Sequence, residues 1–192
     1  MKKRLLSALL CAAMLLSLPA AFAAAGLDGH WAKKYIDYLA DEDIINPSAT
    51  TGKYSPDAKV TRAEFMRYVN RAFHFEETAS ITYTDVPKSA WYYETVCIAQ
   101  KYGYINGVGN NKMDPTGTVT REQAATIIGR LYKADPGSVS ASSLDFKDKA
   151  KISSWSAGYI KAAVDKGFLA GYSDGTFQPT REVTRGEVAK II

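Results

Sequence analysis

Residues 60–64 read Val-Thr-Arg-Ala-Glu, residues 119–123 read Val-Thr-Arg-Glu-Gln, and residues 183–187 read Val-Thr-Arg-Gly-Glu. In each copy a threonine stands three residues before a Glu or Gln, which is the capping-box pattern of a helix N-terminus. The threonine oxygen accepts a hydrogen bond from the backbone N–H three residues on, and the Glu or Gln side chain binds the threonine N–H in return. The pattern therefore predicts three helices that begin after Thr61, Thr120 and Thr184.

A second feature recurs with the same period. A tryptophan lies 30 or 31 residues before the arginine of each pattern, at Trp31, Trp91 and Trp155. Apolar residues follow each tryptophan at matching offsets and stay close to one face of a helix. Clusters of Gly, Asn and Asp at 107–113 and 171–177 then predict tight turns or short hairpins. Each repeat is expected to be helix, loop and capped helix, and the three copies must share a core because one such unit cannot bury its own apolar face.

The repeats are assigned to residues 26–75, 84–133 and 144–192, joined by polar linkers at 76–82 and 134–143. The third copy stops eight residues after Thr184, whereas the second runs from Thr120 to about Lys133. We therefore expect the last helix to be truncated and the chain to be a fragment of a longer protein.

Residues 1–23 are expected to be a cleaved secretory signal peptide. Three basic residues at 2–4 precede an apolar run over 5–18, and Ala21-Phe22-Ala23 forms a small-x-small cleavage site. The run is shorter than the roughly 20 residues of a membrane-spanning helix, which argues against an N-terminal anchor. Removing its three basic residues from the total of 24 leaves 21 against 20 acidic ones, a net charge of +1. That balance argues against a nucleic-acid partner, and we expect a secreted protein with no membrane contact after cleavage.

The sequence offers no catalytic constellation, metal-ligand spacing or cofactor motif. His30 and His74 do not recur between the repeats, and Cys97 is the only cysteine after the signal, so no intramolecular disulfide is expected. Asp85 and Asp148 are interpreted as caps or turn formers. We expect a binding module rather than an enzyme.

The capping box does not explain the arginine that follows each threonine. Arg62, Arg121 and Arg185 occupy the first helical position, where the helix dipole favours acidic residues. One interpretation is a solvated arginine or one paired with a carboxylate. The other is a guanidinium that faces an anionic ligand beside free helix N–H groups, where a carboxylate would find a two-pronged donor.

The tryptophans and loop residues also leave two interpretations open. A tryptophan at a helix start can belong to the core, or its half-exposed indole can stack on the apolar face of a sugar. The loop glycines serve the turn or let a ligand approach the backbone closely. Asp174 can bind sugar hydroxyls, although closing the turn is its favoured role.

The three tryptophans, Gly-Tyr-Ser-Asp-Gly-Thr-Phe at 171–177 and the threefold Val-Thr-Arg pattern together resemble the S-layer homology domain family, over residues 26–192. The resemblance implies a mainly helical, all-α fold with three prongs in pseudo-threefold arrangement. It also implies grooves between the prongs that bind secondary cell-wall polysaccharide bearing a pyruvate ketal. The glycan-binding residues implied are Arg62, Arg121, Arg185, Trp31, Trp91, Trp155, Gly107 and Gly171, to which we add Asp174.

One repeat departs from the pattern, because Pro47 stands where the others have Gly107 and Gly171, and its groove is expected to be altered. The predicted function is non-covalent anchoring of a secreted protein at the bacterial cell wall and surface layer. Two alternatives remain: the anchor portion of an exported enzyme, such as a glycoside hydrolase, with its catalytic domain beyond residue 192, and a module that only self-assembles with protein.

Overall fold

The computed structural model describes residues 27–48 and 51–192, so the predicted signal peptide lies outside the described residues. Its six α-helices are α1 (Lys33–Asp41), α2 (Arg62–Ala72), α3 (Tyr93–Tyr102), α4 (Arg121–Leu131), α5 (Ala157–Asp165) and α6 (Arg185–Ile191). Two short 3₁₀ turns, η1 (Ala141–Ser143) and η2 (Lys149–Lys151), precede α5. The described residues contain isolated β-bridges but no extended strand, which confirms the predicted mainly helical class. None of the helices in this part of the chain has the length and apolar character needed to span a bilayer.

The helix ends follow the local sequence. Complete capping boxes start α2, α4 and α6, with the side chains of Thr61, Thr120 and Thr184 each accepting from the backbone N–H three residues on. After α1, α3 and α5 the chain turns through a left-handed residue, with φ of 54° at Asp43, 67° at Gly103 and 74° at Gly167. Glycine is favoured there because it has no Cβ, while Asp43 tolerates the conformation less well.

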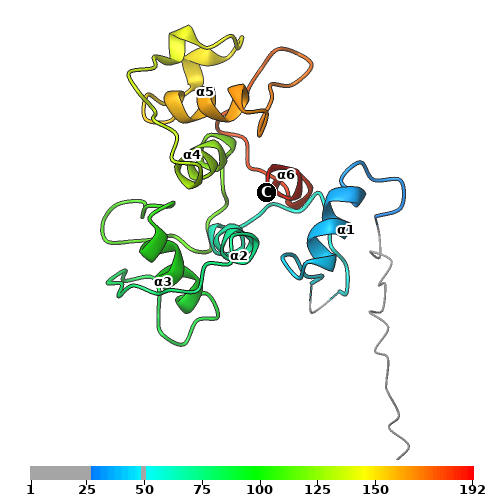
Figure 1. Cartoon of the computed structure of the whole chain (residues 1–192), viewed down its shortest axis with the longest axis vertical. Coiled ribbons are helices and arrows are strands. Elements are labelled where there is room, and N and C mark those ends of the chain that lie inside the picture. The colour runs from blue at the N-terminus through cyan, green and yellow to red at the C-terminus, as the bar shows by residue number, and fades with distance from the viewer. Residues whose placement is uncertain (1–26, 49–50) are drawn as a thin grey trace, which may run out of the picture.

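The helices pair across repeat boundaries rather than within them. Helix α2 packs on α3, α4 packs on α5, and α6 packs on α1. Figure 1 shows the result as three lobes, with α2, α4 and α6 towards the centre and α3, α5 and α1 outside them. Each lobe therefore combines the capped helix of one repeat with the first helix of another, and the third repeat closes back on the first.

Three valines join the lobes at the centre. The Val60 N–H donates to the Val183 carbonyl at 3.2 Å, the Val183 N–H to the Val119 carbonyl at 2.9 Å, and the Val119 N–H to the Val60 carbonyl at 3.1 Å. All three side chains are fully buried. The closed ring agrees with the predicted pseudo-threefold arrangement, which itself stays a prediction.

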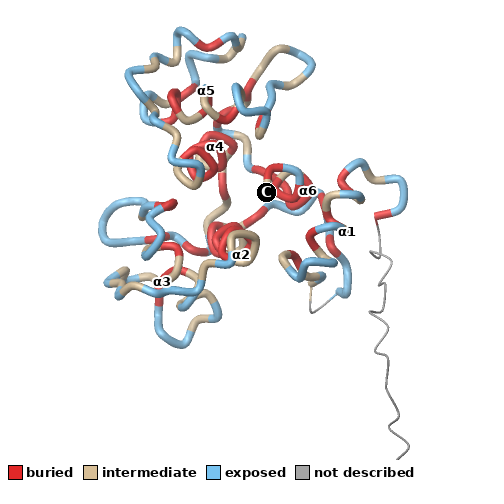
Figure 2. The backbone as a smooth tube through the Cα atoms, viewed as in Figure 1, coloured by how far each residue is buried: buried red, intermediate tan, exposed pale blue. Residues whose placement is uncertain are grey.

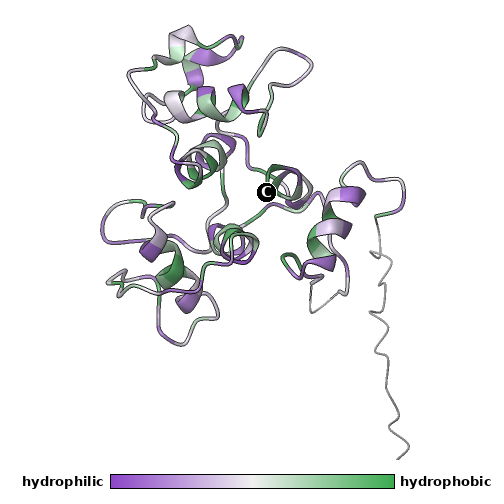
Figure 3. Cartoon of the chain, in the orientation of Figure 1, coloured by the Kyte–Doolittle hydropathy of each residue, from purple (hydrophilic) through white to green (hydrophobic). Residues whose placement is uncertain are grey.

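The core lies along the inner faces of the lobes. Buried segments concentrate on the central helices in Figure 2, and Figure 3 places apolar segments of the chain on the same helices. One apolar cluster spans the α6–α1 and α2–α3 lobes, and a second fills the α4–α5 lobe. The loops that join the elements remain largely exposed (Figure 2).

Candidate functional site

The three repeated arginines clamp one repeat to the next. The Arg62 Nε donates to the Met113 carbonyl at 2.8 Å and its Nη2 to the Asn106 carbonyl at 2.7 Å. Arg121 repeats this arrangement, donating to the carbonyls of Phe177 (2.9 Å) and Ala170. These arginines are therefore neither solvated nor paired with a carboxylate, and the unfavourable N1 position is explained by carbonyl acceptors in the next repeat.

Arg185 completes the set only in part. Its Nη2 donates to the Asn46 carbonyl at 2.9 Å, while its buried Nε has no partner among the described residues. The loop of the first repeat, where Pro47 replaces glycine, presents one carbonyl to this arginine instead of two. The expectation that this repeat is altered is consistent with that difference.

The predicted free helix N–H groups are absent from the described helix starts, so that part of the hypothesis is wrong. At the start of α2 the Arg62 N–H donates to the Gly117 carbonyl and the Ala63 N–H to the Pro115 carbonyl. The corresponding groups of α4 and α6 donate to equivalent carbonyls. Because the N3 amide is taken by the capping threonine, the ends of these helices offer no free backbone donor to an anion.

The arginines nevertheless carry their charge into the space between lobes. Burial lowers the pKa of Arg62 and of Arg121, but a guanidinium titrates so far above neutrality that both stay protonated. Nη1 is not among the bonded atoms of either residue, and both side chains line a groove. One edge of each buried cation thus remains available to a ligand.

The tryptophans do not belong to the core. Trp31, Trp91 and Trp155 are 53%, 56% and 51% exposed, and each lies at most two residues before its helix. Their helices instead bury the apolar residue five positions further on, such as Ile36. Half-exposed indoles at groove edges are suited to stack on a sugar ring, so the sequence alternative of a stacking platform is the one compatible with the structure.

The first groove, here the Arg62 groove, lies between the α2–α3 and α4–α5 lobes and has a volume of about 440 Å³. Its lining combines Arg62 of the first repeat, Gly107 of the second and Trp155 of the third. Arg130 on α4 adds a second cation, and no acidic side chain lines the groove. The volume falls within the range of small-molecule sites, and the charge favours an anion.

The second groove, the Arg121 groove, lies between the α4–α5 and α6–α1 lobes. It holds the equivalent trio of Arg121, Gly171 and Trp31, with Lys190 and Glu187 beside them. Its volume of about 230 Å³ is about half that of the Arg62 groove, and the one acidic side chain in its lining, Glu187, is paired with Arg181 at 2.5 Å. Partial burial opposes ionisation of Glu187, yet hydrogen bonds from Arg181, Thr184 and Tyr172 outweigh it and hold the pKa of this carboxyl below its usual value.

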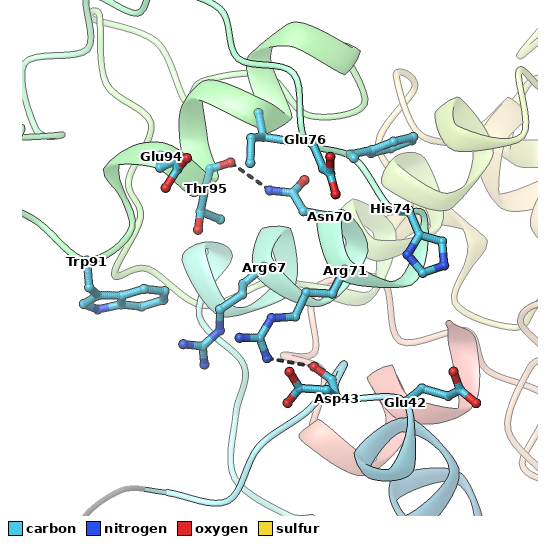
Figure 4. Close-up of a pocket in the computed structure, with 12 residues that line it drawn as sticks. Glu42, Asp43, Arg67, Asn70, Arg71, His74, Glu76, Trp91, Glu94 and Thr95 are labelled. Atoms are coloured by element: carbon cyan, nitrogen blue, oxygen red, sulfur yellow. Dashed lines mark hydrogen bonds between the residues drawn. The ribbon is translucent and has the colours of Figure 1, made fainter.

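The third groove, the Arg67 groove, lies between the α6–α1 and α2–α3 lobes (Figure 4). Trp91 lines it, but Arg185 and Pro47 do not. Its cations are Arg67 and Arg71, and the Arg71 Nη1 donates to the Asp43 carbonyl at 2.9 Å. Four acidic side chains also line it: Glu42, Asp43, Glu76 and Glu94. This surplus of negative charge sets it apart from the other two.

The remaining predicted residues have structural roles. A Cβ on Gly107 would lie 2.5 Å from the Lys112 carbonyl oxygen, and one on Gly171 would lie 2.8 Å from a ring carbon of Phe146. Loop packing therefore requires both glycines without any ligand. The Asp174 carboxylate accepts from the Thr176 N–H at 2.8 Å and from its hydroxyl at 2.7 Å, and this residue is not among those lining the Arg121 groove. It closes a turn, as its favoured interpretation held.

Two acidic residues have partners that the sequence did not indicate. Asp85 was expected to cap or form a turn, but its carboxylate accepts from the N–H groups of Met113 and Asp114, 28 and 29 residues away. The Asp148 carboxylate likewise accepts from the N–H groups of Phe177 and Gln178. Both carboxylates fasten the loop of their own repeat to the segment before its first helix, which fixes the carbonyls that the arginines use.

The repeated sequence matches the S-layer homology domain at residues 27–66, 82–125 and 145–189, more than half of the chain. The chain belongs to the S-layer homology domain family. An amylopullulanase from Thermoanaerobacterium thermosulfurigenes is 32% identical over 166 residues, covering 85% of this chain and 9% of that protein. The exoglucanase XynX from Acetivibrio thermocellus is 33% identical over 168 residues, covering 85% of the chain and 15% of the enzyme.

A surface-layer 125 kDa protein from Lysinibacillus sphaericus is 26% identical over 165 residues, covering 84% of this chain and 14% of its own length. The S-layer homology repeats thus span only a small part of each of these relatives. The similarity of this chain to the two enzymes and to the surface-layer protein is confined to that part. The similarities support anchoring at the cell surface and a secreted, wall-associated location for the S-layer homology chain.

Proposed function

We propose that this chain anchors non-covalently to the bacterial cell wall by binding an anionic wall polysaccharide, with the Arg62 groove as its main site. The observation that carries the proposal is the lining of that groove, where two arginines and one half-exposed indole meet without an acidic side chain. An acidic sugar needs both features, a cation for its carboxylate and an aromatic face for its ring. A pyruvate ketal on the wall polysaccharide, as in the family this chain belongs to, supplies that carboxylate.

Within the groove the two arginines have different tasks. Hydrogen bonds from Nε and Nη2 to two carbonyl oxygens hold the Arg62 guanidinium in one orientation, so that Nη1 is the nitrogen left for a ligand. Arg130 has no ion pair among the described residues, and its guanidinium carbon lies 5.6 Å from the Tyr159 ring. Arg130 is thus the more adaptable cation, and a carboxylate between the two would take charge-assisted hydrogen bonds from both.

The Arg121 groove is the second candidate for the same ligand, with lower affinity. It repeats the arginine, glycine and indole of the first groove, but it is smaller and its lining includes an acidic side chain, Glu187, which the Arg62 groove lacks. The Arg67 groove has the opposite charge balance and is not proposed to take the polysaccharide.

A second function is favoured by the relatives. The amylopullulanase and the exoglucanase resemble this chain only over its S-layer homology repeats, which a surface-layer protein also contains. The same kind of anchor thus serves enzymes as well as surface-layer proteins. We propose that the chain carries a cargo in the same manner, either an exported glycoside hydrolase or a surface-layer protein. Self-assembly with protein alone is the competing proposal.

A wall-binding assay with matched tryptophan variants tests the proposal. Trp155→Ala removes the indole of the Arg62 groove, and Trp91→Ala removes an equally exposed indole from the Arg67 groove. We expect Trp155→Ala to weaken binding to purified wall sacculi, measured by sedimentation, by about fivefold or more, taking as a guide the roughly 1–3 kcal/mol that an aromatic side chain contributes when a nucleic-acid base stacks on it. Trp91→Ala should leave binding unchanged.

Extraction of the polysaccharide from the sacculi separates the alternatives. Wall binding that survives extraction would favour a protein partner and contradict the glycan proposal. Equal losses in the two tryptophan variants would contradict the choice of groove.

A further inference from the structure

Tyr172 lines the Arg121 groove, and two charged side chains hold it there. Its hydroxyl donates to the Glu187 Oε1 at 3.0 Å. The Arg181 Nη1 donates to the Tyr172 hydroxyl and, at 2.5 Å, to the same carboxylate oxygen. Hydrogen bonds that involve an ionised partner are stronger than those between neutral groups. This closed triangle, here the Tyr172 latch, therefore fixes the phenol in one place although the residue belongs to a loop.

The phenol ring covers the cation of the groove. The Arg121 guanidinium carbon lies 4.5 Å from the centre of the Tyr172 ring and 4.9 Å from that of the Phe177 ring. Arg62, the equivalent cation, has no aromatic ring over its guanidinium among the described residues. A ligand that approaches Arg121 from the side of the phenol thus meets the ring first.

The Arg62 groove shows what the same space contains without the phenol. Both linings hold an arginine of a capping pattern, a loop glycine and an indole. The residue that follows the loop glycine is Tyr172 in one groove and Val108 in the other. Valine has no hydrogen-bonding group, so its side chain cannot be fastened across the groove.

The two residues that fasten the phenol are also particular to the Arg121 groove. Arg181 lies three residues before its capping threonine, and Gly117 has that position in the second repeat. Gln123 stands in place of Glu187, and its side chain accepts from the Thr120 N–H as the capping box requires. The latch is thus a combination of three residues that the Arg62 groove lacks, and it does not follow from the repeat itself.

The volumes of the two grooves agree with this difference. Small-molecule sites usually measure roughly 300–1,000 Å³. The Arg62 groove, at about 440 Å³, falls within this range, and the Arg121 groove, at about 230 Å³, falls below it. The phenol takes up space beside the cation, where a sugar would have to lie to reach Arg121.

We propose that Tyr172 determines which ligands the Arg121 groove accepts, and that the latch must open before a wall sugar can enter. With the latch closed, the groove excludes an acidic sugar of the size that the Arg62 groove takes. Opening breaks the hydrogen bonds of the Tyr172 hydroxyl, so the apparent affinity falls in proportion to the fraction of chains with an open latch. The inference rests on the proposed function, because it concerns the same ligand in the second groove.

Calorimetric titration with the pyruvylated wall disaccharide tests the latch in the full chain carrying Trp155→Ala, which removes the indole of the Arg62 groove. Tyr172→Val introduces the residue of the second repeat, and Tyr172→Phe keeps the ring but removes the hydroxyl. We expect Tyr172→Val to raise the affinity by about tenfold, because a hydrogen bond to a charged group no longer has to be broken. Tyr172→Phe should raise it by a smaller factor, since the ring still covers Arg121.

Tyr38→Val is the matched control, because Tyr38 is a 65% exposed tyrosine of α1 that lines none of the three grooves. It should leave the affinity unchanged, and circular dichroism should show the same helical content in all variants. An affinity that Tyr172→Val leaves unchanged would overturn the latch. An affinity that it lowers would do the same, because Tyr172 would then be a ligand contact.

NMR of the chain without ligand gives an independent readout. We expect nuclear Overhauser contacts between the Tyr172 ring protons and the Arg121 side chain, and we expect these contacts to weaken as the disaccharide is added. Their absence from the free chain would overturn the latch even if the disaccharide binds. If the contacts are present but neither the wild type nor any variant binds the disaccharide, the proposed function fails, and this inference fails with it.

Discussion

Replacing the repeated arginines by alanine is expected to destabilise the junctions unequally, with Arg121→Ala costing more than Arg185→Ala. Arg121 donates to two carbonyls, of Phe177 and Ala170, and its guanidinium carbon lies 4.5 Å from the Tyr172 ring and 4.9 Å from the Phe177 ring. Arg185 donates to the Asn46 carbonyl alone and carries a buried Nε without a partner. The two residues occupy the same position in their repeats and are buried to the same degree.

The magnitude follows from these contacts. A hydrogen bond to a charged group contributes about 1.5–3 kcal/mol, so the two bonds of Arg121 amount to about 3–6 kcal/mol before the cost of burying the charge is subtracted. We expect a net loss of about 3 kcal/mol in the free energy of unfolding for Arg121→Ala. For Arg185→Ala we expect about 1 kcal/mol, because one bond is lost and one unsatisfied buried donor is removed with it.

Urea unfolding followed by circular dichroism measures both free energies of unfolding. An unchanged m value, the slope of this free energy against urea concentration, would indicate that the two variants expose the same surface on unfolding. Arg130→Ala is the control, since the side chain of this arginine has no hydrogen bond or ion pair among the described residues, and the substitution should cost less than about 1 kcal/mol. Equal losses for Arg121→Ala and Arg185→Ala, or a larger loss for the latter, would refute the clamp. A loss of wall binding in either alanine variant would not by itself identify a ligand contact, since the clamp shapes the grooves.

Three further predictions concern the acidic residues. Asp85→Ala should lower the free energy of unfolding in urea by about 2 kcal/mol, because two backbone N–H groups lose their acceptor. The control Asp174→Ala, in an exposed turn, should lower it by less than about 1 kcal/mol. Equal losses would contradict the role of Asp85 in holding its loop. Glu122→Ala should lower the free energy of unfolding by about 3 kcal/mol, since the buried Glu122 carboxylate accepts from the Ser153 N–H and from the hydroxyls of Ser153 and Ser156. A loss below about 1 kcal/mol in the same assay would show that water takes over these hydrogen bonds. The folded pKa of Glu187 is lowered, so its carboxylate stabilises the fold above the unfolded pKa and ceases to do so as the pH falls through the folded one; unfolding between neutral and acidic pH should therefore depend less steeply on pH in Glu187→Gln, and identical pH profiles would argue against this linkage.

Local features were predictable from the sequence, and pairings across repeats were not. The capping boxes depend on residues three positions apart, and they are present as predicted at Thr61, Thr120 and Thr184. The left-handed residues after the first helices likewise followed from Gly103 and Gly167. Both signals act within one turn of the chain, so no tertiary information was needed.

The partners of the arginines lie 44 to 139 residues away, and this distance explains the failure of the helix N–H hypothesis. The helix dipole makes an arginine at the first helical position unusual, but an anion can bind there only if the helix end is free. Whether that end is free depends on the loop of the next repeat, whose carbonyls reach it only in the folded chain. The residues that line the Arg62 groove could not be predicted for the same reason, because they come from all three repeats and meet only in the folded chain.

One missed role did leave a signal. Glu122 follows the arginine of the second repeat, where the other copies have Ala63 and Gly186. A carboxylate in place of two small residues indicates a contact special to that repeat, which the structure provides at Ser153 and Ser156 before α5. Comparing the copies position by position also singles out Tyr68, where the other two repeats have isoleucine.

An acidic sugar is proposed to bind in the Arg62 groove through its carboxylate. Calorimetric titration of the chain with a pyruvylated wall disaccharide, and with the same disaccharide lacking the ketal, tests it most directly when repeated on Arg130→Gln. We predict that the wild type prefers the pyruvylated sugar by about tenfold or more, and that Arg130→Gln loses most of that preference while still binding the unmodified sugar. Equal affinity for the two sugars in the wild type, or a preference that Arg130→Gln retains in full, would contradict the claim.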